Sequence, residues 1–347
     1  MPGSVLLDAL PPAAAWPPLG AAGFAIPMQT RAWMQARLRL IGQPPALRLL
    51  AVRTGDAIDA IAPLFRHGRW LRELPLLFEP SDLVWSTPES LRRLAAALAA
   101  QPQPLYLERV PADSPTIAAL RRAYALRGML RLRPAMPTPF IELGEGARGV
   151  DACLNAGRRS DLRRAERRAQ ALGAVSYELH SPAGEDELAS LLAEAYTVEA
   201  RSWKAAEGTA LTEDRTQGDF IASFAREAAR DGILRIALMR IDGRAVAMQI
   251  AVQWRNRFWL LKTSYDKSCS RCSPGQLLML HTLRHAIGER LLSYEFMGVM
   301  DEWTRLWTLR TREYVQLRAY PFSAQTAAML VSHGVRPMLE RARRILG

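Results

Sequence analysis

Lysine is nearly absent from this strongly basic chain. Arginine supplies all but three of its 46 basic residues, and the three lysines are Lys204, Lys262 and Lys267. A lysine ammonium is a compact charge with an adjustable pKa, which a guanidinium does not offer. All three lysines lie in the second half of the chain. We therefore interpret them as candidate functional groups, with chance placement as the alternative.

Other absences exclude whole classes of protein. Cysteine occurs only at Cys153, Cys269 and Cys272, too few for a disulfide framework, and the odd number fits a reducing cytosol. No apolar run of about 18 residues lacks a charge or a proline, so no transmembrane segment is predicted. The N-terminus has no basic n-region, which argues against a signal peptide. We expect a cytoplasmic protein, with peripheral membrane contact left open.

Familiar nucleotide and hydrolase motifs are also missing. The chain has no P-loop, no dinucleotide fingerprint and no Gly-x-Ser-x-Gly nucleophile elbow. Its 347 residues and 49% hydrophobic content fit two packed domains of ordinary size. The net charge of +12 attracts anions, and it does not distinguish cofactor phosphates from a nucleic acid or an acidic membrane.

The order of apolar patterns and turns predicts an α/β (α+β) chain in four parts. These are a Pro/Ala-rich, loosely structured lead-in, an N-terminal half, a C-terminal half and a basic C-terminal helix, over residues 1–30, 31–145, 146–321 and 322–347. Helices are expected at 31–42, 88–101, 113–127, 148–172, 185–204, 216–230 and 275–290. Strands are expected at 46–53, 57–65, 104–110, 174–180, 233–241, 245–254, 257–265, 293–298 and 312–320.

One predicted hairpin has a similar sequence in each half of the chain. Residues 47–62 align without gaps on residues 234–249, with a Gly/Asp turn between two apolar strands in each. This similarity favours a duplicated α/β unit. In the second hairpin, the strand at 245–254 has one large apolar face and one small, polar face that includes Gln249. We consider a ligand surface and a solvated surface equally good interpretations of that small face.

Five segments, in this order, resemble the CelD-type acetyltransferases of the GNAT superfamily, which are relatives of the FemA/FemX peptidoglycan ligases. The first contains a strand with Pro-Leu and a Ser-Asp pair, the second an Arg-rich helix, and the third Ser-Trp-Lys. The fourth contains Lys, Tyr-Asp and Ser-Pro-Gly, and the fifth is Tyr-Glu-Phe-Met-Gly. They cover residues 60–85, 157–179, 199–211, 262–278 and 294–298.

The resemblance implies tandem GNAT-like halves, each with a mixed, mostly antiparallel sheet flanked by helices. It also implies transfer of an acyl group from a thioester to an amine-bearing substrate. Acetyl-CoA or another acyl-CoA would then be a co-substrate, with no permanently bound cofactor. The chain departs from the usual pyrophosphate loop, because the stretch 271–276 keeps only one glycine. A Tyr-Lys pair frequent in the group is also replaced, by residues 301–307.

The acyl-donor site is expected where the strand at 257–265 leads into the helix at 275–290. Ser-Pro-Gly at the start of a helix is typical of a cap, and exposed amides at the same place suit a pyrophosphate. We predict that the donor binds to Ser273, Pro274, Gly275, Gln276 and Leu277. Plain helix capping is the alternative.

Acyl transfer to an amine needs a base, a group that holds the oxyanion, and an acid for the leaving group. Asp266 is the predicted base or orienting group, Tyr265 the acid, and Lys262 the group that stabilises negative charge. For each of them, a salt-bridged strand end is an equally good interpretation. Glu295 and Asp301 are the next candidates for the base.

Substrate binding is predicted at Trp203, Lys204 and Arg158. Trp203 can equally be a core residue. Arg158 opens a run of arginines that continues to Arg168, and such a run is most often a solvated helix face. Its functional alternative is a flank that binds a CoA phosphate, a carboxylated substrate or RNA.

The spacing of the cysteine and histidine residues argues against a zinc site. Cys269 and Cys272 are followed by His281 and His285 at helical spacing, but the separation of the two pairs is shorter than in zinc fingers. We predict no metal. Two alternatives to a CoA-dependent N-acyltransferase are kept. One is a Fem-type transferase that uses aminoacyl-tRNA, the only case in which a nucleic acid is expected. The other is a non-catalytic double-GNAT scaffold.

Overall fold

A computed structural model describes residues 3–20, 25–41, 47–73, 79–144, 154–202, 215–323 and 326. The chain forms two compact units. Unit 1 comprises residues 1–31, 44–136 and 313–347, and unit 2 comprises residues 32–43 and 137–312. These bounds differ from the predicted halves, 31–145 and 146–321, and the predicted four-part division stays a prediction.

The units are not consecutive because two elements pack away from their sequence neighbours. Helix α1 (Arg31–Ile41) places Trp33 edge-on against Phe220 and Phe224, with ring centroids 4.8 Å apart in both pairs. Most of α1 therefore belongs to unit 2. Strand β13 (Thr311–Pro321) pairs antiparallel with β6 (Leu105–Pro111), which brings the end of the described chain into unit 1.

Unit 1 is a mixed sheet with strand order β1-β2-β3-β4-β6-β13-β7, and β5 pairs with β3. Its core lies between this sheet and two helices, α2 and α3, and includes Leu94 and Leu120. The elements not yet given are β1 (Ser4–Leu7), β2 (Leu47–Thr54), β3 (Ala57–His67), β4 (Trp70–Arg72), β5 (Val84–Trp85), α2 (Pro88–Ala99), α3 (Pro115–Tyr124) and β7 (Gly128–Glu142).

The N-terminal lead-in contains three short regular elements within its described residues, which are β1 and 3-10 helices at Ala13–Ala15 and Pro27–Gln29. Leu6 of β1 lies opposite Leu50 of β2. The Gln29 side chain is buried and donates a hydrogen bond to the carbonyl of Leu83 at 2.7 Å. The composition predicts a loosely structured lead-in, and these contacts attach parts of it to the rest of unit 1.

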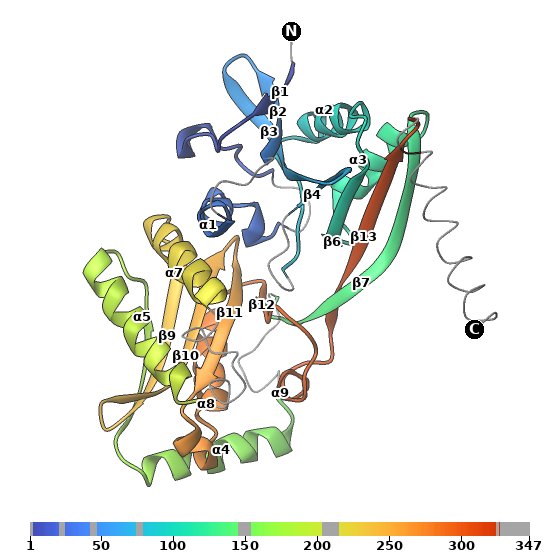
Figure 1. Ribbon diagram of the computed structural model, residues 1–347. Helices are drawn as coiled ribbons and strands as arrows, with labels where there is room; N and C mark the ends of the chain where they lie inside the picture. Colours follow the sequence, from blue (N-terminus) through green and yellow to red (C-terminus); the bar gives the residue numbers. More distant parts are fainter. Residues whose placement is uncertain are drawn as a thin grey trace, which may run out of the picture. The chain divides into compact units, whose positions relative to one another are not determined.

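Unit 2 is a second mixed sheet, with strand order β7-β12-β11-β10-β9-β8. Helices α5 and α7 cover one face and α8 covers the other (Figure 1). A short 3-10 helix, η4, joins β11 to α8. The elements are α4 (Ala156–Gln170), β8 (Val175–His180), α5 (Glu185–Ala200), α7 (Arg215–Arg230), β9 (Leu234–Ile241), β10 (Arg244–Trp254), β11 (Arg257–Tyr265), η4 (Lys267–Cys272), α8 (Pro274–Gly288), β12 (Ser293–Glu295) and α9 (Glu302–Arg305).

The two segments predicted to correspond do form similar hairpins. β2 and β3 are antiparallel and close at the pair Thr54–Ala57, and β9 and β10 are antiparallel and close at Ile241–Arg244. Each hairpin contains one irregularity in its register near the turn. The α/β fold class, with mixed sheets flanked by helices, is confirmed.

The small face of β10 is neither a ligand surface nor a solvated surface. Gln249 is 1% exposed, and its side-chain oxygen accepts a hydrogen bond from Thr282 of α8 at 2.9 Å. Ala247 and Ala251 are also buried. Small side chains here let α8 pack closely on the sheet, which is the reason for the pattern.

The sequence does not predict strand β7, because Pro134, Pro137 and Pro139 interrupt its sequence and proline disfavours a strand.

The predicted basic helix at 322–347 lies outside the described residues, apart from three positions. In the described part of the chain, no helix combines the length and apolar character that crossing a membrane requires.

Candidate active site

Two parallel strands of unit 2 meet at one end only. β11 pairs with β12 at three positions, Arg257 with Ser293, Phe258 with Tyr294 and Trp259 with Glu295. β12 then ends, whereas β11 continues to Tyr265. The second half of β11 therefore has no pairing partner in β12, and its edge is open to a ligand.

A pocket of about 840 Å³ lies at this divergence, and we call it the cleft. One wall is the free half of β11, and the other is formed by the segment after β12 and by α9. The cleft combines apolar side chains with two carboxylates and one ammonium, a mixture typical of ligand sites. Its lining residues are Leu260, Leu261, Lys262, Thr263, Phe296, Met297, Asp301, Glu302, Trp303 and Leu306.

Of the two lysines within the described residues, Lys262 lines this cleft and Lys267 does not. The Lys262 ammonium donates a hydrogen bond to Oε1 of Gln217 on α7 at 2.5 Å. Oε1 of Glu199 on α5 lies 3.4 Å from Lys262 Nζ. Glu199 is fully buried, and the Lys262 side chain is 12% exposed. Residues from a strand and two helices therefore fix one cation in the wall of the cleft.

Asp266 is engaged by neighbours in a way that disfavours its predicted role as base. It caps η4 by accepting hydrogen bonds from the amide and hydroxyl of Ser268, at 2.9 and 2.6 Å. Its second oxygen lies 3.1 Å from Nη1 of Arg244. Burial opposes ionisation, but the Ser268 bonds and the charges of Arg244 and Arg201 outweigh it, so the pKa of Asp266 is lowered. A carboxylate with a lowered pKa is a weak proton acceptor.

Tyr265 lies against the start of α8. A Cβ atom added at Gly275 would come within 3.2 Å of Cδ1 of the Tyr265 ring. Tyr265 is not among the residues that line the cleft, so it stands at the junction between the cleft and the helix start. Its role as an acid stays a prediction.

The predicted donor segment starts α8 in a different way from the expected serine cap. Ser273 has a left-handed backbone with φ 49°, and its side chain makes no capping bond. Its carbonyl accepts the amides of Gln276 and Leu277 at 3.0 and 3.2 Å. Pro274 has no amide hydrogen, and Leu277 is a core residue with 1% exposure. Ser273, Gly275 and Gln276 are the half-exposed members of the segment.

Arg158 reaches this helix start from α4. Its guanidinium donates a hydrogen bond to the side-chain oxygen of Gln276, which also accepts Trp307 Nε1 at 2.8 Å. The Arg158 guanidinium carbon lies 5.1 Å from the centroid of the Trp307 ring. Burial lowers the pKa of Arg158, and its Nε is buried without a hydrogen-bond partner in the described part of the chain. A cation held beside a helix start suits a phosphate.

The remaining arginines of α4 mostly form an exposed face. Arg163, Arg164, Arg167 and Arg168 are exposed, and Arg164 pairs with Asp161. Arg168 is also within reach of η4, since its Nη1 donates to the carbonyl of Arg271 at 3.4 Å. The predicted substrate residues Trp203 and Lys204 lie outside the described residues.

The cysteine and histidine pairs take part in ordinary packing. The His281 ring stacks on Tyr177 with a centroid distance of 5.1 Å, and burial lowers the pKa of His281. His285 Nε2 lies 3.1 Å from the side-chain oxygen of Gln253, and Cys272 Sγ donates to the carbonyl of Cys269 at 3.0 Å. Within the described ranges, no group of three or more His, Cys, Asp or Glu side chains is placed to hold a metal ion.

The two reserve candidates for the base differ sharply. Glu295 is buried and accepts hydrogen bonds from Arg312, at 2.6 to 2.9 Å, and from Ser293 at 2.5 Å. Asp301 is exposed, lines the cleft and uses its backbone amide to bond Thr304 Oγ1 at 2.8 Å. Of the two reserve candidates, Asp301 is therefore the one that a substrate in the cleft can reach, and its neighbour Glu302 is also exposed and lines the cleft.

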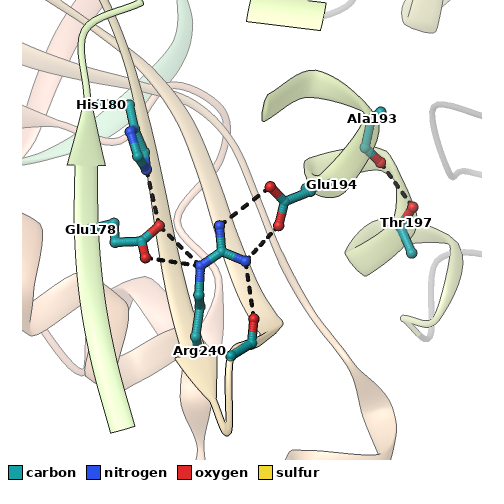
Figure 2. A network of polar contacts seen from close by, with 7 residues as sticks. Glu178, His180, Ala193, Glu194, Thr197 and Arg240 are labelled. Atoms are coloured by element: carbon teal, nitrogen blue, oxygen red, sulfur yellow. Dashed lines mark hydrogen bonds and ion pairs between the residues drawn. The ribbon is translucent and has the colours of Figure 1, made fainter. Parts of the chain in front are cut away.

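Sequence reasoning gave no role to Glu199 or Gln217. Glu199 stands five residues before the Ser-Trp-Lys lysine, but nothing in its spacing indicates that it faces Lys262. Helix α5, which carries Glu199, is also anchored by Glu194. Figure 2 shows Arg240 of β9 between Glu194 and Glu178, with Nη1–Oε2 and Nε–Oε1 distances of 2.5 and 2.9 Å. This network attaches α5 to the edge of the sheet.

Residues 156–305, which lie within unit 2, match the family model of the acetyltransferase (GNAT) domain. Among curated proteins, none matches this chain. The solved structures with a similar fold include FemX, with a TM-score of 0.58 at 11% identity over 88% of this chain and 94% of that one.

Two further structures with a similar fold come from bacteria. One is the C-terminal domain (DUF2156) of a putative lysylphosphatidylglycerol synthetase from Agrobacterium fabrum, with a TM-score of 0.52 at 12% identity over 85% of this chain and 90% of that one. The other is L-PGS from Bacillus licheniformis, with a TM-score of 0.51 and the same identity and coverage. At such identities the likeness shows the fold alone. The family match shows more, and by it this chain carries a GNAT acetyltransferase domain and is a transferase.

Proposed function

We propose that the chain is an N-acyltransferase that moves an acyl group from a thioester of coenzyme A to an amine bound in the cleft. The observation that carries the proposal is the divergence of β11 and β12 around a pocket whose wall holds the ammonium of Lys262. Both strands lie inside the segment that matches the GNAT domain. Within that superfamily we place the chain among the CelD-type proteins, because five of its sequence segments resemble theirs in order.

In the proposed reaction the amine nitrogen attacks the thioester carbonyl carbon, a C–N bond forms, and the C–S bond breaks. Lys262 holds the carbonyl oxygen as it becomes negative. Asp301, one of the two exposed carboxylates of the cleft, takes the proton that the amine loses. Tyr265 gives a proton to the departing thiolate. Asp266 has the supporting role of capping η4, the turn that leads to the donor site.

The start of α8 and Arg158 are the proposed contacts of the donor's phosphates. Two half-exposed residues, Gly275 and Gln276, and a guanidinium with no carboxylate bonded to it in the described structure meet there. Trp203 and Lys204 remain proposed contacts of the acceptor. The chemical identity of the amine is left to experiment, and cytoplasmic residence belongs to the same proposal.

A second donor, an aminoacyl-tRNA, is favoured by two observations. The fold similarity to FemX extends over most of this chain, and Arg168, one of the exposed arginines of α4, reaches η4 beside the proposed donor site. An aminoacyl ester and an acyl thioester present the same carbonyl chemistry, so the same cleft can serve either.

A binding panel of acetyl-CoA, palmitoyl-CoA and a non-hydrolysable aminoacyl-tRNA analogue tests the proposal. A donor present at 100 times its dissociation constant adds about 2.7 kcal/mol to the free energy of unfolding. We expect a thermal shift with at least one CoA thioester. A thermal shift with the tRNA analogue alone would show that the donor is aminoacyl-tRNA and not acyl-CoA. No shift with any of the three would contradict the proposed function.

A further inference from the structure

Glu199 is a charged side chain with no access to solvent. It lies in the last turn of α5 and is 0% exposed. A carboxylate in such a place is costly unless a cation or hydrogen-bond donors compensate its charge. The compensating cation is Lys262, whose Nζ lies 3.4 Å from Glu199 Oε1.

The pair is asymmetric, because only one of its members faces the cleft. Lys262 lines the cleft, whereas Glu199 does not. Gln217 of α7 accepts a hydrogen bond from the same ammonium at 2.5 Å. A lysine side chain has four rotatable bonds and loses much freedom when it is held in one position. Two partners from two helices oppose that freedom and keep the ammonium in the wall of the cleft.

We propose that Glu199 is a positioning residue, which acts by holding the Lys262 ammonium where the acyl carbonyl oxygen develops its charge, with Gln217 as the second holder. This inference rests on the proposed function, since it takes the cleft as the place of acyl transfer. Glu199 does not touch the substrate. It fixes the place of a charge that does, and a fixed charge stabilises a transition state better than a mobile one.

The scarcity of lysine makes the inference measurable without any substrate. Acetylation by an N-hydroxysuccinimide ester modifies only neutral amines, and mass spectrometry can follow Lys262 and Lys267 separately as the pH is raised. Lys267 is exposed and serves as an internal reference. In Glu199→Gln the ammonium loses a counterion 3.4 Å away. We expect Lys262 to be acetylated faster in Glu199→Gln than in the wild type at the same pH, with the rate at Lys267 unchanged.

Glu194→Gln is the matched control. Glu194 lies on the same helix and pairs with Arg240, so this variant also removes an ion pair of α5 but leaves Lys262 with its partners. The acetylation rate at Lys262 should match that of the wild type in the control. An unchanged rate in Glu199→Gln, or equal increases in both variants, would overturn the inference.

Kinetics with the donor found by the binding panel completes the test. Glu199→Gln should lower kcat about tenfold or more, with a change in KM of less than about threefold. Glu199→Asp should recover part of the loss, and Glu194→Gln should keep wild-type kcat. Wild-type kcat in Glu199→Gln would overturn the inference. If Glu199→Gln does not fold, Gln217→Leu takes its place, with the same loss of kcat expected.

The acetylation of Lys262 can be measured without any acyl donor. This measurement therefore still tests the role of Glu199 if the proposed function fails.

Discussion

Tyr265 lies close to Gly275 at the start of α8: a Cβ atom added to the glycine would stand 3.2 Å from the tyrosine ring, a tight contact that the ring would have to relieve by a small shift. Strand β11 and helix α8 therefore meet at the point where the acyl donor is proposed to bind. The close approach favours glycine at this position without any contribution from a ligand.

The contact between Tyr265 and Gly275 leads to a double-mutant prediction. Gly275→Val overpacks the junction and should lower the free energy of unfolding by about 1 to 3 kcal/mol. Tyr265→Ala removes packing and should also destabilise the protein. The valine methyl groups can fill the space that the ring vacates. The double variant should therefore lose less unfolding free energy than the two single variants lose together, by at least about 0.5 kcal/mol. Urea unfolding measures all four proteins, and strict additivity would contradict the packing described here.

Arg158 gives a prediction for donor binding. Arg158→Ala removes the guanidinium beside the start of α8 and should weaken CoA binding about tenfold, since a charge-assisted hydrogen bond contributes about 1.5 to 3 kcal/mol. The matched control is Arg164→Ala, on the same helix, which removes an exposed arginine paired with Asp161. Isothermal titration calorimetry should separate the two variants. Equal losses would show that Arg158 acts only through the net charge of the helix.

Asp82 in unit 1 predicts a specific dependence of stability on pH. Burial raises its pKa from 3.8 to about 6, against the hydrogen bonds from Ser114 and Thr116. Between those two values the folded chain holds a proton that the unfolded chain has lost, so stability falls as the pH rises through this window. A shift of about two units corresponds to a loss on the order of 3 kcal/mol.

The comparison with Asp82→Asn isolates this effect. The difference in unfolding free energy between the wild type and Asp82→Asn should change by about this amount between pH 4 and pH 7. Asp56→Asn, at an exposed turn, is the control and should show no such change. A constant difference across the range would mean that Asp82 is ionised in the fold.

The regular elements of unit 2 could largely be predicted from its sequence. Alternating apolar residues and the Asp-Gly and Arg-Asn turns predicted β9, β10 and β11 to within one residue of their observed ends. Strand β7 could not be found in this way, because its three prolines contradict the usual composition of a strand. Its pairing with neighbours on both sides decides its conformation, and pairing is not visible in local sequence.

The site could be predicted in part. The rarity of lysine pointed to Lys262, and Lys262 does line the cleft. Its partner Glu199 could not be found, since the contact joins a helix to a strand far along the chain. Asp266 illustrates the opposite case. Its sequence position suits a base, but the bonds to Ser268 and Arg244 that lower its pKa are created only by the fold.

The most direct test of the central claim is to fill the cleft. Leu261→Trp places a large ring in the wall of the pocket at a half-exposed position, next to Lys262. Titration of the wild type and this variant with the donor that gives the strongest thermal shift, together with circular dichroism to verify folding, measures whether the acyl end of the donor enters the cleft. We predict that the folded variant loses donor binding by about a hundredfold, or about 2.7 kcal/mol. Wild-type affinity in the variant would contradict the assignment of the cleft.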